Sequence, residues 1–124
     1  EALDVVFSDL LQAPDARDPS RIDELAWVGE IAGSKAVLLS KASATREVEL
    51  WEWRLEAGER YPSQPDAVGW SEQFYVFEGC LTLELTGGDQ RIGTGEFYMF
   101  ASHQPHAYRN DGPGPVRFVR NVVI

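Results

Sequence analysis

Two histidines, His103 and His106, stand close together in the stretch ASHQPHAYRN and are the only imidazoles in the 124-residue chain. Imidazole binds metals and exchanges protons near neutral pH, so these two residues are the first candidates for a functional site. His106 opens an alternating segment in which Tyr108 and Asn110 share its face. His103 falls three residues earlier, where a tight turn is expected. We therefore expect His106 to face a cavity and His103 to lie at the surface.

Glu72 is a second polar residue on an apolar face. In WSEQFYVFEG, residues 70–79, strand alternation places it beside Phe74 and Val76. A carboxylate in an apolar lining is costly unless it is paired, protonated or bound to a metal. If Glu72 is unpaired there, desolvation should raise its pKa. If its strand and the His106 segment line one interior, the two side chains meet.

The elements that must position these residues are predicted to be strands. Short apolar runs alternate with Gly- and Pro-rich turns, and Gly87–Gly88 predicts a hairpin. In EVELWEWRL, residues 47–55, both faces are apolar, so the strand is either covered on both sides or changes phase at a bulge. Many short strands without long helices between them indicate an all-β sandwich or barrel.

The first 26 residues differ in character from the rest. EALDVVFSDLL has apolar residues at helical spacing, which predicts a short N-terminal helical segment. The polar, proline-containing stretch QAPDARDPSRIDE predicts a linker or an exposed arm. The sequence therefore predicts two parts, residues 1–26 as a helical tail with a linker and residues 27–124 as the β domain.

Charge and composition exclude several partners. The net charge is −9, which repels nucleic-acid phosphates and anionic membranes. No apolar stretch is long enough to cross a bilayer. The single cysteine, Cys80, excludes an internal disulfide, fits a reducing cytoplasm and is expected to be a structural thiol. We expect a cytoplasmic protein that makes no membrane contact.

Two spaced motifs resemble those of the cupin superfamily. Gly58, Glu72 and Gly79 match the first motif, with six residues between Glu72 and Gly79. Gly95, His106 and Asn110 match the second motif in register, although Ala101 and His103 replace its proline and glycine. The resemblance covers residues 48–124 and implies a cupin-type double-stranded β-helix, a jelly-roll barrel.

The departure from the family pattern concerns the ligands. The paired histidines of the first motif are absent, and Gln64 and Asp66 stand about where they should be. The resemblance therefore implies that no cofactor is required, and that any divalent metal (Zn, Mn, Fe or Ni) is weakly held by Asp66, Glu72 and His106. The expected ligand-binding cavity comprises Gln64, Asp66, Glu72, Phe74, His106, Tyr108 and Arg120. Arg120 could pair with Glu72 or bind an anionic ligand, but we expect a salt bridge at the rim.

A narrower resemblance concerns regulators. EVELWEWRLEAGERY, EQFYVFEGCLTLEL and QPHAYRNDGPGPVRFV are similar to the C-terminal cupin of XRE-type bacterial transcriptional regulators, and EALDVVFSDLL to the end of their helix-turn-helix module. This implies a homodimeric sensor of a small organic ligand that touches DNA only through an upstream domain.

Two other functions stay open at the level of sequence. One is a stand-alone metal-dependent cupin enzyme, such as a dioxygenase, isomerase or decarboxylase. The missing histidines speak against it, so we do not expect an enzyme. The other is a purely structural dimerisation module.

Overall fold

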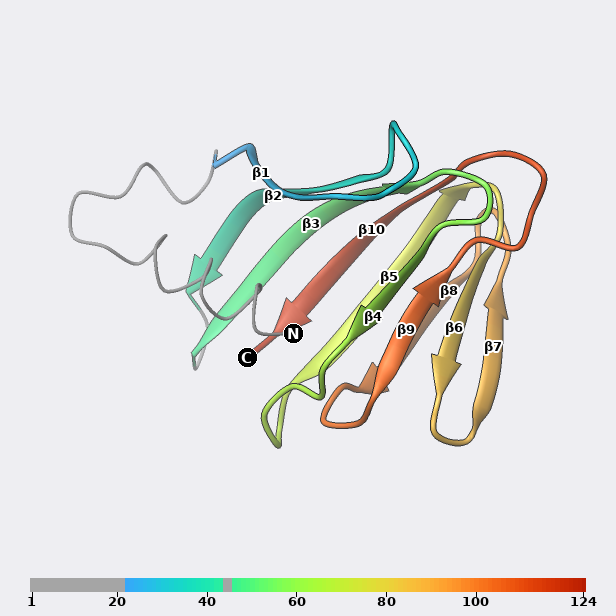
Figure 1. Cartoon of the computed structure of the whole chain (residues 1–124). Coiled ribbons are helices and arrows are strands. Elements are labelled where there is room, and N and C mark those ends of the chain that lie inside the picture. Colours follow the sequence, from blue (N-terminus) through green and yellow to red (C-terminus); the bar gives the residue numbers. More distant parts are fainter. Residues whose placement is uncertain (1–21, 44–45) are drawn as a thin grey trace.

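The computed structural model describes residues 22–43 and 46–124, which form two antiparallel sheets that face each other (Figure 1). The larger sheet has the strand order β1 (Glu24–Val28), β2 (Lys35–Ser43), β3 (Glu47–Leu55), β10 (Val116–Val123), β5 (Ser71–Glu78) and β8 (Phe97–Ala101). The smaller sheet has the order β4 (Arg60–Ser63), β9 (His106–Arg109), β6 (Leu81–Leu85) and β7 (Gly88–Ile92).

The described residues contain no helix, which confirms the predicted all-β class. None of these residues belongs to a helix with the length and hydropathy needed to span a membrane. The predicted N-terminal helical segment lies outside the described residues. The predicted boundary between residues 26 and 27 stays a prediction.

Strand β3 shows why this sequence forms a sheet with one inner face. Burial alternates along all nine residues, so Trp51, Trp53 and Leu55 point inward while Val48 and Leu50 are only partly buried. The phase change that the sequence left open does not occur within β3. Alternation of this kind arises because successive side chains of a strand leave opposite faces.

The core lies between the two sheets and is rich in aromatic rings. Trp53 of the larger sheet stacks on Phe118, with ring centroids 5.9 Å apart. Trp53 also meets Tyr61 and Tyr108 of the smaller sheet edge-on, at 4.9 Å and 5.1 Å. Such contacts bury large apolar areas and hold the sheets together.

Two turns show why Gly79 and Asn110 stand at their positions in the two motifs. Gly79 joins β5 to β6 with φ of 80°, a conformation that suits glycine. Asn110 is buried after β9, where its side-chain amide donates to the carbonyls of Leu55 and Gly114 and its oxygen accepts from Gly112 N. The predicted hairpin at Gly87–Gly88 is confirmed, because Leu85 pairs with Gly88.

Candidate functional site

Glu72 and His106 meet in the interior, although they belong to different sheets. Glu72 is on β5 of the larger sheet and His106 opens β9 of the smaller one. Both side chains are buried, and His106 Nε2 lies 3.5 Å from Glu72 Oε2. The structure therefore brings together the carboxylate and the imidazole that the alternation patterns singled out.

Tyr108 and Arg120 complete a chain of contacts to Glu72. Arg120 Nη1 donates to the Tyr108 hydroxyl at 2.7 Å, and that hydroxyl donates to Glu72 Oε1 at 2.5 Å. The guanidinium also stacks against the core tryptophans, 4.7 Å from the ring centroid of Trp51 and 5.1 Å from that of Trp53. Because Arg120 is 0% exposed, the expected salt bridge at the rim is wrong.

The environment of Glu72 favours its charged form. Burial by itself would raise the pKa of Glu72, but the charge of Arg120 and the hydrogen bonds of His106 and Tyr108 outweigh burial and lower it to about 2. The raised pKa was expected only for an unpaired Glu72, and that condition is not met, because the carboxylate is paired.

Asp66 brings a second carboxylate to the same place. It lies in the loop after β4, which Ser102 anchors by accepting from Asp66 N at 2.9 Å and donating to Trp70 O at 3.1 Å. Burial, and next the nearby charge of Glu72, raise the pKa of Asp66 to about 6. Asp66 therefore takes up a proton far more readily than Glu72.

His106 is held in one orientation by its backbone neighbour. Its Nδ1 lies 2.7 Å from the carbonyl of Gln104, which can only accept, so Nδ1 carries a proton. Nε2 then faces the carboxylates, either as a donor or with a free lone pair. Burial lowers the pKa of His106, but its hydrogen bond to Glu72 and the charge of Glu72 raise it more. When the ring is protonated, it forms an ion pair with Glu72.

Asp66, Glu72 and His106 form a possible metal-binding group. Each offers one ligand atom, and these atoms all lie within 4.8 Å of one another. His106 Nε2 is buried and points toward Glu72 Oε2, 3.5 Å away. An imidazole and two carboxylates fit a divalent metal, but closed zinc sites have four protein ligands. The donors present would bind such an ion weakly.

The other expected cavity residues lie in different surroundings. Phe74 is in the core, stacked on Phe100 at 5.9 Å, and touches Tyr108 edge-on at 5.3 Å. Gln64 follows β4 but is exposed. His103 is exposed in the turn before β9, as its sequence position indicated. The expected ligand-binding role of Phe74 and Gln64 stays a prediction.

Glu49 is an interior carboxylate that the sequence reasoning missed. It is 1% exposed on β3 and accepts a hydrogen bond from Trp51 Nε1 at 3.0 Å. The signal was present in EVELWEWRL, because strand alternation places Glu49 on the face of Trp51. On that face Glu49 is the neighbour of Trp51, against which Arg120 stacks, so the interior is more polar than predicted.

Two facing antiparallel sheets around one core define a jelly-roll type of β-barrel. The family model Cupin_2, described as a cupin domain, matches residues 51–124. The chain belongs to the cupin family, and the resemblance read from its two motifs is confirmed.

Solved structures of regulators are among those that this chain is similar to. The Cupin_2 domain of an XRE family transcriptional regulator from Enterobacter cloacae is 27% identical, with a TM-score of 0.60, over 62% of this chain and 81% of that chain. An HTH_3 family transcriptional regulator from Vibrio cholerae is 22% identical, with a TM-score of 0.68. The match covers 96% of this chain, which spans only 61% of that regulator.

Cupins with other descriptions share the fold. A sugar phosphate isomerase from Silicibacter pomeroyi is 19% identical over 78% of this chain and 69% of that chain, with a TM-score of 0.56. No curated protein matches the chain.

Proposed function

We propose that this chain is the small-molecule-sensing part of a bacterial DNA-binding transcriptional regulator. In this proposal, residues 27–124 bind a small organic ligand inside the barrel, and residues 1–26 connect them to an upstream helix-turn-helix that contacts DNA. The regulator acts as a homodimer in the cytoplasm. The 27% identity to the cupin domain of the Enterobacter cloacae XRE regulator supports this reading.

The observation that carries the proposal is the buried ionic group in the core. Glu72, His106, Tyr108 and Arg120 are each 5% exposed or less, among aromatic rings. Buried ion pairs add little stability relative to apolar packing of the same volume. A protein that used this interior only for stability would gain from apolar residues there. We therefore infer that the group serves binding.

Ligand binding would change the contacts within this group. A polar molecule that enters beside the Asp66 loop would compete for His106 Nε2 or for Glu72 Oε2, the two atoms 3.5 Å apart. Asp66, with its pKa of about 6, would adjust its proton to the charge of that molecule. The ligand shifts a regulator between two states only by binding one of them more tightly.

A metal-dependent enzyme is the second candidate, favoured by the clustering of Asp66, Glu72 and His106 within 4.8 Å. The Silicibacter pomeroyi relative, described as a sugar phosphate isomerase, shares the fold at 19% identity. An ion bound here would supply Lewis-acid chemistry to a substrate oxygen. The single imidazole makes the donor set poorer than three histidines with a carboxylate.

Thermal unfolding of the 124-residue chain against a library of small organic metabolites tests the sensor. We expect a ligand that raises the melting temperature of the metal-free chain, and raises it further with concentration. His106→Asn should abolish this shift, whereas His103→Asn, which changes the exposed histidine, should retain it. Stabilisation that requires Zn²⁺, Mn²⁺, Fe²⁺ or Ni²⁺ would favour the enzyme instead.

A further inference from the structure

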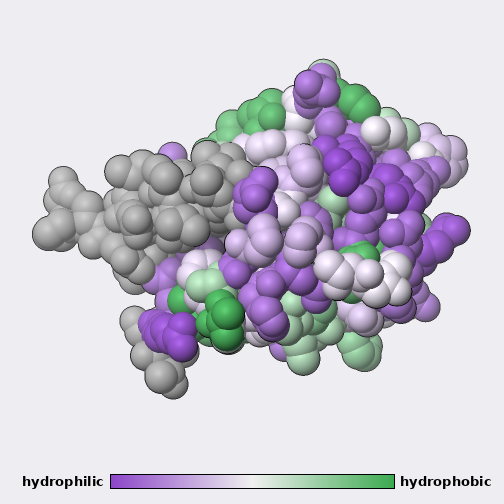
Figure 2. All heavy atoms as spheres, turned by 60° about the horizontal axis from the view of Figure 1, so that its bottom comes forward, coloured by the Kyte–Doolittle hydropathy of each residue, from purple (hydrophilic) through white to green (hydrophobic). Residues whose placement is uncertain are grey.

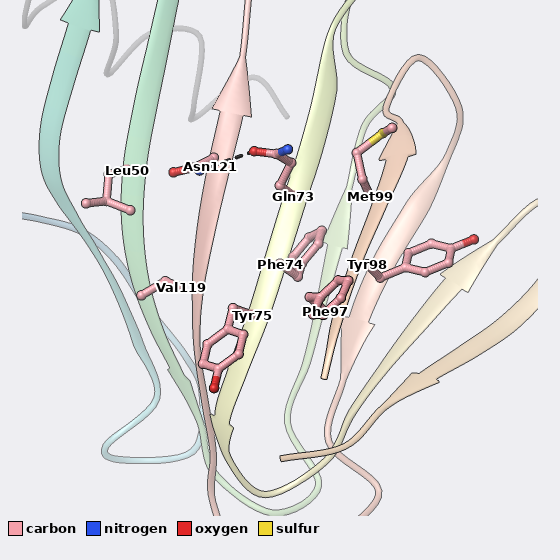
Figure 3. Close-up of a pocket in the computed structure, with 9 residues that line it drawn as sticks. All are labelled: Leu50, Gln73, Phe74, Tyr75, Phe97, Tyr98, Met99, Val119 and Asn121. Atoms are coloured by element: carbon pink, nitrogen blue, oxygen red, sulfur yellow. Dashed lines mark hydrogen bonds between the residues drawn. The ribbon is translucent and has the colours of Figure 1, made fainter. Parts of the chain in front are cut away.

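The outer face of the larger sheet exposes large apolar side chains around a shallow hollow. We call the residues labelled in Figure 3, except the inward-pointing Phe74 and Tyr98, the outer sheet face. Phe97 is 78% exposed and Met99 58%, both on the edge strand β8. Tyr75 on β5 is 45% exposed. Large exposed apolar groups in one place indicate an interaction surface.

Strand pairing aligns these side chains in two rows across the sheet, as Figure 3 shows. One row runs from β8 to β10 through Phe97, Tyr75 and Val119. The other runs from β8 to β3 through Met99, Gln73, Asn121 and Leu50. Gln73 accepts a hydrogen bond from Asn121 at 3.3 Å, so the two polar side chains inside the face are hydrogen-bonded to each other.

The hollow contains no charged residue, although charged residues make up 25% of the chain. At that frequency about two of its nine lining residues would be charged. Hydrophilic residues predominate on the face of the molecule in Figure 2. Two copies with a net charge of −9 repel each other over acidic surfaces, and least where charge is absent.

The border of the face also favours a second copy. A neighbouring hollow on the same side of the sheet is lined by Lys35, Arg54 and Arg117 together with Glu52. Arg54 pairs with Glu56 and Arg117 pairs with Glu78, so this border is charged but nearly balanced and adds little to the repulsion between two otherwise acidic molecules. An apolar centre with a charged rim is the usual anatomy of a protein interface.

The shape of the hollow suits part of a partner. It is shallow and has a volume of about 270 Å³, at the lower limit of the roughly 300–1,000 Å³ of small-molecule sites. It suits a protruding side chain such as Phe97, which stands at its border. A face that carries both a protruding ring and a hollow is complementary to itself, as a two-fold symmetric interface requires.

The whole outer side of the larger sheet, of which the outer sheet face covers four strands, approaches the size of a standard dimer interface. Six strands about 4.8 Å apart and roughly seven residues long present a face of roughly 650 Å². A standard interface buries about 800 Å² on each partner. Protruding side chains and contacts at the rim add to the flat area of the sheet and bring the buried area close to that value. We propose that the outer sheet face packs against the same face of a second copy of this chain, rather than pairing strand edges.

This proposal deepens the homodimer part of the proposed function and is tested without any ligand. Sedimentation velocity of the 124-residue chain between 1 and 100 μM should show a species of twice 13.9 kDa. Phe97→Asp should weaken that dimer at least tenfold, because it brings two carboxylates into the apolar centre. Val68→Asp is the matched control, since Val68 is 81% exposed and outside the face. It should leave the dimer unchanged.

Three results would overturn the proposal. A wild-type chain that stays monomeric at 100 μM excludes the interface. A dimer that persists in both Phe97→Asp and Met99→Asp lies elsewhere, such as at the edge strands β1 or β7. A wild-type monomer whose Phe97→Asp variant melts at a markedly lower temperature would indicate that another part of the same chain covers the face. Failure of ligand screening with the dimer intact would leave the interface standing and remove only the sensor.

Discussion

Arg120 and Glu72 carry opposite charges inside the aromatic core, and the Tyr108 hydroxyl connects them by one accepted and one donated hydrogen bond. Both charged side chains are 1% exposed or less. The arrangement compensates a carboxylate that would otherwise be neutralised by protonation. It also explains why the pKa of Glu72 lies at about 2 despite complete burial.

Removing the positive partner should destabilise the fold strongly. We expect Arg120→Met to lower the free energy of unfolding by about 3–5 kcal/mol, because it leaves the Glu72 charge without the guanidinium. Arg120→Met with Glu72→Gln should recover part of this loss. Urea denaturation followed by circular dichroism measures the loss.

Arg117→Met is the matched control on the same strand, where the side chain is 39% exposed, and should change stability by less than about 1 kcal/mol. Equal losses in Arg120→Met and Arg117→Met would contradict the role of Arg120.

Metal binding should depend on one histidine and not on the other. After treatment with EDTA, calorimetric titration with ZnCl₂ should show one weak site, with a Kd of roughly micromolar or above, because three protein donors are fewer than the four of closed sites. His106→Asn should remove the heat of binding, while the exposed His103→Asn keeps it. Binding that survives in His106→Asn would place the ion outside the Asp66, Glu72 and His106 group.

The ion pairs of Glu84, on the outside of the smaller sheet, should make the stability of the fold depend on pH. Hydrogen bonds from Arg60, reinforced by those from Arg109, lower the pKa of Glu84 to about 2, and these contacts are 2.9 Å and 2.8 Å long. A lowered pKa means that Glu84 stabilises the fold fully above about pH 4.5, and that this contribution is lost as the pH falls toward 2.

Glu84→Gln should therefore cost about 1 kcal/mol or less at pH 7, and progressively less at pH 4 and pH 3. Urea denaturation at these three values measures the change. Glu30→Gln, at an exposed glutamate in the β1–β2 turn, serves as the control for the loss of one surface charge. A difference that grows as the pH falls would have the wrong sign for this ion pair.

Gly79 should not tolerate a side chain. A Cβ at this position would lie 2.5 Å from the Pro115 carbonyl oxygen and 3.0 Å from Val116 Cα, in a backbone with φ of 80°. Strain and overlap together predict a loss of about 2–4 kcal/mol for Gly79→Ala. Gly87→Ala, with no atom within 4 Å of its Cβ, should lose less than about 1 kcal/mol. Thermal melts of the two variants compare them directly, and similar melting temperatures would argue against the clash.

The sequence alone determined the class of fold and the inward direction of several side chains. Alternation placed Glu72 with Phe74 and Val76, and it placed His106 with Tyr108, because the direction of a side chain in a strand depends only on its position along that strand. The motifs around Gly58, Gly79 and Gly95 were sufficient to indicate the cupin family, which the match over residues 51–124 confirms.

Only the tertiary structure decided which charges meet. Arg120 was expected at a rim and lies in the core, because its strand β10 is central in the larger sheet, between β3 and β5. Asp66 comes to Glu72 through the contacts of its loop with Ser102, and Tyr108 reaches Glu72 across the space between the sheets. Which strands become neighbours and which face each other depends on pairing across long stretches of chain, and local periodicity carries no information about that pairing.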